Sequence, residues 1–151
     1  MKNLFDAVRK LPGFEKIDAS ATGIGSLVYA VKPGDGSARE QAASCQKVLG
    51  GFANICYEFA TKRYRSNCIN WGILPFTIDK DINFPYSNGD SIFVPGIRDA
   101  VRNGIEDIPA KVIRTDGSVE DLMLHVKGLT ADEKDIILDG CLMNYYANRA
   151  E

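Results

Sequence analysis

The chain has 151 residues, 45% of them hydrophobic, and a net charge of −2. That length and composition are typical of one globular domain with a hydrophobic core. The nearly balanced charge gives no general reason to expect a nucleic acid or an anionic membrane as partner, and no apolar run approaches the roughly 20 residues that span a bilayer. The N-terminus lacks the continuous apolar stretch of a secretory signal, so we expect a cytoplasmic location.

The first half of the chain alternates predicted helices and strands. In chain order we expect a short helix over 4–8, a buried strand over 26–31, a helix over 37–49, a buried strand over 52–59 and a polar helix over 60–72. Apolar and β-branched runs indicate the strands, and Gly50 and Gly51 would end the second helix. A Gly-rich turn separates the first strand from that helix.

The second half predicts shorter strands and a terminal helix. Residues 73–78 form a short apolar run, and Pro75 places it at a sheet edge or makes it irregular. After a loop around residues 85–89, we expect a strand over 91–97 and a hairpin over 110–126 that turns at 116–117. Residues 129–151 predict one helix, begun by a capping box of Thr130 and Glu133. The expected fold class is α/β, with a mixed sheet flanked by helices.

The four cysteines, Cys45, Cys56, Cys68 and Cys141, have no close pair among them, and His125 is the one histidine. Zinc and redox motifs need close pairs, and iron–sulfur clusters need cysteine runs, so the chain alone predicts no metal site. We expect buried, reduced thiols. His125 is expected on the surface or in the core, and residues 79–81 in a solvated turn.

Ser37 has two interpretations. Ser37 and Glu40 have the spacing of a capping box, in which the serine hydroxyl accepts a backbone N–H and the glutamate reaches back. However, Arg39 would place a cation at the positive end of the helix dipole, which is unfavourable. Turn glycines, free N–H groups, a serine and an arginine also make a good anion site. Phosphate-loop, dinucleotide and nucleophile-elbow patterns are absent, so the residues predict a carboxylate or phosphate site.

An ordered series of motifs covers about half of the chain. It consists of "GDGSAREQA" at 34–42, "GG" at 50–51 and "GILP" at 72–75, each after a predicted strand or helix. The series resembles the C-terminal swivelling domain of the aconitase superfamily, which includes aconitases, homoaconitases and isopropylmalate isomerases. The end of the chain is weakly similar to the C-terminus of single-chain aconitase-like hydratases.

This resemblance implies a swivelling β/β/α fold and a hydro-lyase that dehydrates and rehydrates a hydroxy-polycarboxylate such as citrate or isocitrate. It assigns to Ser37 the role of the base that removes the carbon-bound proton, and to Arg39 the binding of a substrate carboxylate. Ala38 stands where the family has a second serine with substrate contacts, so its hydroxyl contact is lost while its backbone N–H remains. A 4Fe-4S cluster would be bound by other domains and not by this chain.

The family's upstream stretch of the type Asp-x-Ile-Ser-Thr-Asp is not found in residues 1–25. We therefore expect that residues 1–151 form a single swivel domain of a longer hydratase, inactive without the cluster-bearing domains. The alternatives are the small subunit of a two-subunit isopropylmalate or homoaconitate-type isomerase, and an RNA-binding module related to aconitase. The latter would use Lys62, Arg63 and Arg65 around Tyr64, although a solvated helix face is the simpler interpretation.

Overall fold

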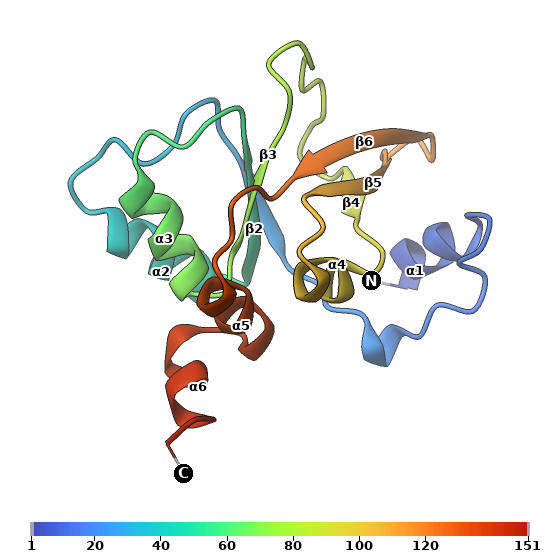
Figure 1. Cartoon of the computed structure of the whole chain (residues 1–151). Helices are drawn as coiled ribbons and strands as arrows, with labels where there is room; N and C mark the ends of the chain where they lie inside the picture. The colour runs from blue at the N-terminus through green and yellow to red at the C-terminus, as the bar shows by residue number, and fades with distance from the viewer. Residues whose placement is uncertain (1, 151) are drawn as a thin grey trace.

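A computed structural model describes residues 2–150, in which six strands form one mixed sheet in the order β1-β2-β3-β6-β5-β4 (Figure 1). The strands are β1 (Ser26–Tyr29), β2 (Gly51–Cys56), β3 (Leu74–Thr77), β4 (Ser91–Phe93), β5 (Asp107–Ile113) and β6 (Val119–His125). The helices are α1 (Lys2–Arg9), α2 (Arg39–Val48), α3 (Lys62–Asn70), α4 (Ile97–Asn103), α5 (Ala131–Asp139) and α6 (Leu142–Ala147), with a short 3₁₀ turn at Ala19–Ala21. The expected α/β class with a mixed sheet is confirmed.

The sheet has a parallel half and an antiparallel half. Strands β1, β2 and β3 are parallel, and α2 and α3 connect them. Strands β6, β5 and β4 are antiparallel, with β5 and β6 joined as the expected hairpin. The two halves meet through one pair in register, Thr77 and His125. Because the three parallel strands run in the same direction, their carboxyl ends lie at one edge of the sheet, where open α/β folds commonly bind ligands.

Two hydrophobic clusters support the parallel half. The larger one is built on the sheet, and its fully buried side chains include Ile55, Phe76 and Leu124. The smaller one joins α2 to α3 through Ala43, Tyr64, Cys68 and Ile73. Figure 1 shows α2 and α3 next to each other at the parallel strands, with α1 on the far side of the molecule. Helix α2 is therefore held against α3 by packed side chains around Ala43.

A buried polar network lies under α2 and α3. Asn54 Nδ2 donates to Tyr64 Oη at 3.0 Å and to Cys68 Sγ at 3.3 Å, and Gln46 Nε2 donates to the same phenol at 3.0 Å. Asn54 is 1% exposed and Tyr64 is 3% exposed. Since a buried donor without a partner costs about 1–3 kcal/mol, Tyr64 keeps β2, α2 and α3 in one arrangement.

The first predicted strand was placed wrongly in the core. Strand β1 is an edge strand whose residues are mostly exposed, because it pairs with β2 alone. Of the two positions expected for Pro75, a sheet edge or an irregular strand, the edge is wrong, since β3 lies inside the sheet, between β2 and β6. A proline is tolerated there because β3 pairs with β6 only at Thr77, so most of that side of β3 needs no N–H donor.

The predicted terminal helix is two helices. The capping box of Thr130 and Glu133 is present at the start of α5, as expected. Gly140 ends α5 with a left-handed backbone at φ 96°, and Cys141 then starts α6. A glycine adopts that conformation at no steric cost, so the chain turns where the sequence pattern suggested continuity. Helix α4 is a further element that the sequence pattern did not predict.

Candidate functional site at the start of α2

The loop after β1 is attached to the start of α3. The Ala60 N–H donates to Pro33 O at 2.8 Å, and the Thr61 hydroxyl donates to Gly34 O at 3.0 Å. Gly34 has φ 98°, and a Cβ on it would lie 2.4 Å from the Cβ of Tyr64. Both the backbone conformation and this close approach require glycine. The loop that carries Ser37 is thus fixed by contacts with a packed helix.

The capping box predicted for Ser37 and Glu40 is wrong. Ala38 is the N-cap of α2, with no side-chain capping bond. Glu40 Oε1 instead accepts the indole N–H of Trp71 at 3.0 Å. The helix begins one residue later than a Ser37 cap requires, so the hydroxyl does not reach the donors of the first turn. Ser37 is exposed, and within residues 2–150 no hydrogen bond of its hydroxyl is found.

Arg39 is partly buried and is held by its own loop. Its Nε donates to Gly34 O at 3.1 Å, the same carbonyl oxygen that accepts from Thr61. Among the described residues, the Arg39 guanidinium forms no ion pair, so its two terminal amino groups are free to bind an anion. An arginine can bind a carboxylate through two parallel hydrogen bonds.

The first turn of α2 adds further donors. The first backbone bond of the helix runs from the Ala42 N–H to Ala38 O at 2.9 Å. The N–H groups of residues 39–41 are therefore not used within the helix, and the positive end of the helix dipole lies there. Ser37, Ala38 and Arg39 lie together at this point, after the carboxyl end of β1. The arrangement suits an anionic ligand.

His125 lies at the junction of the two sheet halves. It is 9% exposed, and its Nδ1 lies 2.7 Å from Asp107 Oδ1 while its Nε2 lies 3.2 Å from Asp79 Oδ1. The expectation of a core or surface histidine agrees with this position. The Nδ1 contact joins β6 to β5 through Asp107, whereas Nε2 has no hydrogen-bond partner among the described residues.

The cysteines do not fit a cluster site. Within residues 2–150, no group of three or more histidine, cysteine or acidic side chains could hold a metal ion. Cys56 and Cys68 are buried, as expected, whereas Cys45 in α2 is exposed and Cys141, the N-cap of α6, is partly exposed. Burial raises the pKa of the Cys56 thiol to about 12 and that of Cys68 to about 11, so both are protonated near neutral pH.

This burial predicts selective alkylation. In the native chain at pH 8 we expect iodoacetamide to modify Cys45 first and Cys141 more slowly. Cys56 and Cys68 should react only after unfolding, because roughly one thiol in a thousand or fewer is ionised at that pH and both are inaccessible. Peptide mapping by mass spectrometry measures this order, and native modification of Cys68 as fast as that of Cys45 would contradict the packing of α3.

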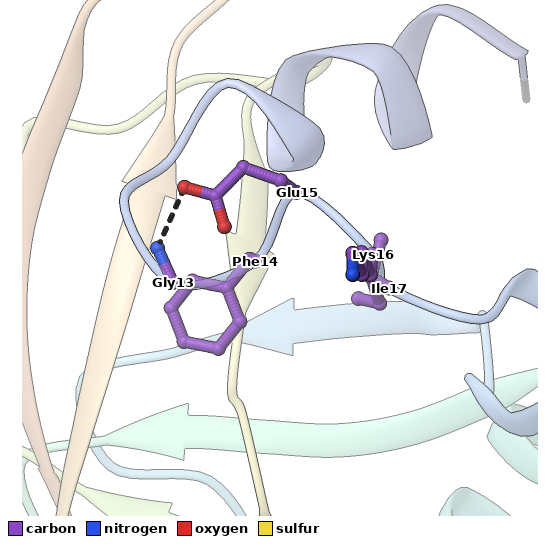
Figure 2. Close-up of a pocket in the computed structure, with 5 residues that line it drawn as sticks. All are labelled: Gly13, Phe14, Glu15, Lys16 and Ile17. Atoms are coloured by element: carbon purple, nitrogen blue, oxygen red, sulfur yellow. Dashed lines mark hydrogen bonds between the residues drawn. The ribbon is translucent and has the colours of Figure 1, made fainter.

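A shallow hollow on the opposite side of the molecule has no comparable chemistry. It is lined by the consecutive residues Gly13, Phe14, Glu15, Lys16 and Ile17 (Figure 2). The dashed line in Figure 2 joins the Gly13 N–H to Glu15 Oε1 at 3.1 Å. The hollow belongs to the loop after α1, far from the start of α2 in Figure 1. It brings together no residues that are distant in the sequence.

The basic segment of α3 does not provide a base-stacking surface. Tyr64, the aromatic residue of that segment, is buried and bonded to Asn54 and Gln46. Arg65 donates to Lys127 O at 2.7 Å. A buried ring cannot stack on a nucleobase, so the RNA-binding interpretation is not favoured. No helix in the described part of the chain is long and apolar enough to cross a membrane.

The fold and the start of α2 together define a mixed α/β domain, of the class that binds ligands at the carboxyl ends of its parallel strands. Residues 20–81 match the model of a protein family, the aconitase C-terminal domain. This segment therefore resembles the C-terminal swivel domain of the aconitase superfamily. The match covers β1, α2, β2, α3 and β3, and it includes Ser37 and Arg39.

Two proteins similar to the chain are aconitate hydratases. The chain is 28% identical over 119 residues to aconitate hydratase A of Bradyrhizobium diazoefficiens, an alignment covering 74% of this chain and 12% of that protein. It is 25% identical over 135 residues to aconitate hydratase A of Rickettsia bellii, covering 85% of this chain and 15% of that protein. The chain thus spans about one seventh of the length of these relatives or less.

Proposed function

We propose that the chain is the substrate-binding and catalytic-serine domain of an aconitase-like hydro-lyase, which dehydrates and rehydrates a hydroxy-polycarboxylate such as citrate. In this proposal residues 1–151 form one swivel domain of a longer hydratase and are inactive without its cluster-bearing domains. The observation that carries the proposal is the start of α2. There an unbonded Ser37 hydroxyl and an anchored Arg39 lie beside unused backbone N–H groups, inside the segment that matches the family.

Each site residue has a physical role in this proposal. Arg39 binds one substrate carboxylate through its terminal amino groups. Ser37 Oγ takes the proton from the substrate carbon. A serine alkoxide is unfavourable near neutral pH, and the positive end of the α2 dipole, its free N–H groups and the Arg39 charge would stabilise it. Ala38 offers the substrate a backbone N–H without a hydroxyl.

The cofactor would come from outside this chain. Because the cysteines described here do not fit a cluster site, the 4Fe-4S cluster of aconitase-type enzymes would be bound by the other domains. The tricarboxylate would then lie between those domains and the start of α2. In this proposal the partners of the chain are those domains and the substrate.

Citrate binding tests the carboxylate role of Arg39. In the isolated wild-type chain we expect citrate to shift the Arg39 side-chain signals in ¹⁵N–¹H NMR spectra, with weak affinity because half of the site is absent. Arg39→Gln should raise the dissociation constant about tenfold or more, since a charged hydrogen bond contributes about 1.5–3 kcal/mol. Arg9→Gln, which removes an exposed charge from α1, serves as the matched control. Equal citrate binding by Arg39→Gln and the wild-type chain would disprove the assignment.

A further inference from the structure

Thr61 forms hydrogen bonds both to helix α3 and to the loop that carries the candidate site. Its hydroxyl oxygen accepts the Tyr64 N–H at 3.2 Å, which makes Thr61 the N-cap of α3. The hydroxyl has one proton, and it donates this proton to Gly34 O at 3.0 Å. The same carbonyl accepts from Arg39 Nε at 3.1 Å. A single side chain therefore joins the start of α3 to the atom that holds the Arg39 guanidinium.

The direction of the Gly34 carbonyl depends on its hydrogen-bond partners as well as on the packing of Gly34 against Tyr64. Gly34 has φ 98°, and Gly36, two residues later, has no atom near the place where its Cβ would be. Glycines adopt many backbone conformations, so these partners help to set the direction of the carbonyl. Thr61 is one of two such partners and the one outside the loop. It is β-branched, which restricts its side chain to few rotamers.

We propose that Thr61 is a positioning residue of the substrate site, which orients the Gly34 carbonyl and thereby aims the Arg39 guanidinium at a substrate carboxylate. The inference rests on the proposed function in one respect, the role of Arg39 as the carboxylate ligand. The bond from Nε to the oriented carbonyl holds the guanidinium at the loop, and among the described residues its two terminal amino groups form no ion pair. Arg39 is then arranged before the ligand arrives, which lowers the cost of binding.

Thr61→Val removes the donor and keeps the shape of the side chain. In the ligand-free chain we expect the Hε of Arg39 to lose its protection against exchange with water, measured by ¹⁵N–¹H NMR. The citrate dissociation constant should rise about threefold to tenfold, the effect of one net hydrogen bond. Thr61→Ser keeps both bonds and should restore both values.

Thr130→Val is the matched control for helix capping. Thr130 caps α5 through the Glu133 N–H, as Thr61 caps α3, and within residues 2–150 no hydrogen bond joins it to the loop of Gly34. The variant should lower the melting temperature by a similar amount and leave Arg39 and citrate binding unchanged.

Should Thr61→Val not fold, Thr61→Asp replaces it, because aspartate retains the capping acceptor and cannot donate to Gly34 O. The Arg39 Hε signal should move in this variant.

The outcomes separate this inference from the proposed function. Unchanged Hε protection and unchanged citrate binding in Thr61→Val would overturn the positioning role and leave the proposed function intact. Absence of citrate binding by the wild-type chain would contradict the role of Arg39 as carboxylate ligand. It would also contradict the proposal that Thr61 directs Arg39 toward a substrate. The orientation of Arg39 by Thr61 would then be decided by the Hε signal alone.

Discussion

Replacing Ser37 by alanine should lower the turnover of the complete hydratase by a factor on the order of 10²–10⁴, the contribution of a positioned acid–base group. In the proposed mechanism, Ser37 Oγ takes the proton from the substrate carbon, and alanine leaves no acceptor there. Because Arg39 remains, the Michaelis constant should change little. Steady-state kinetics of the chain assembled with its cluster-bearing domains measure both values.

The fold should not respond to this substitution. Ser37 is exposed, and Ala38 is the N-cap of α2, so the melting temperature of Ser37→Ala should equal that of the wild-type chain. Ser44→Ala is the control within α2, since its hydroxyl donates to the local carbonyl Gln41 O at 3.3 Å, and it should keep full turnover. Full turnover by Ser37→Ala would show that another group removes the proton.

Gly34→Ala should have a large effect on folding. The new Cβ would lie 2.4–2.6 Å from the Cβ, Cγ and Cδ1 atoms of Tyr64, atoms that cannot move without displacing a buried ring. The left-handed conformation costs alanine about 1–2 kcal/mol, and overpacking costs about 1–3 kcal/mol more. A total near 3 kcal/mol or more is a large part of the 5–15 kcal/mol typical of a domain. Chemical denaturation followed by circular dichroism measures this loss.

Gly36 provides a matched control in the same loop. A Cβ on Gly36 meets no atom within 4 Å, and its φ lies outside the left-handed range. Gly36→Ala should therefore leave the free energy of unfolding within about 0.5 kcal/mol of the wild-type value, as for a surface substitution. If Gly34→Ala were equally harmless, the loop would not be held against Tyr64, and the anchoring of Arg39 would have to be abandoned.

The sequence pattern predicted elements that are determined locally. Hydrophobic runs, a turn and a capping box gave the parallel strands, the hairpin and the start of α5, because these features depend on neighbours in the chain. The pattern could not show which strand would be central. We predicted a buried β1 and an edge or irregular position for Pro75, whereas β1 is the edge strand and β3 lies inside the sheet. Strand order depends on long-range pairing, which a local pattern does not show.

In the candidate site too, local features were predicted from the sequence and long-range contacts were not. The positions of Ser37 and Arg39 after β1 followed from the strand–turn–helix pattern, and their roles remain predictions of the family resemblance. The predicted capping box does not form, and the Glu40 carboxylate instead accepts a hydrogen bond from Trp71, 31 residues away. Thr61 escaped attention for the same reason, since its bond to Gly34 spans 27 residues. The one available signal was the position of Thr61 directly before the basic segment, because threonine is a good helix N-cap.

The most direct test of the central proposal is hydratase activity on cis-aconitate, measured with the chain alone, with the cluster-bearing domains of an aconitase-type enzyme alone, and with the two combined. The proposal predicts no turnover by either part and turnover by the combination, lost again when the chain carries Ser37→Ala. Equal activity of the cluster-bearing domains with and without the chain, in a mixture shown by gel filtration to contain the complex, would contradict it.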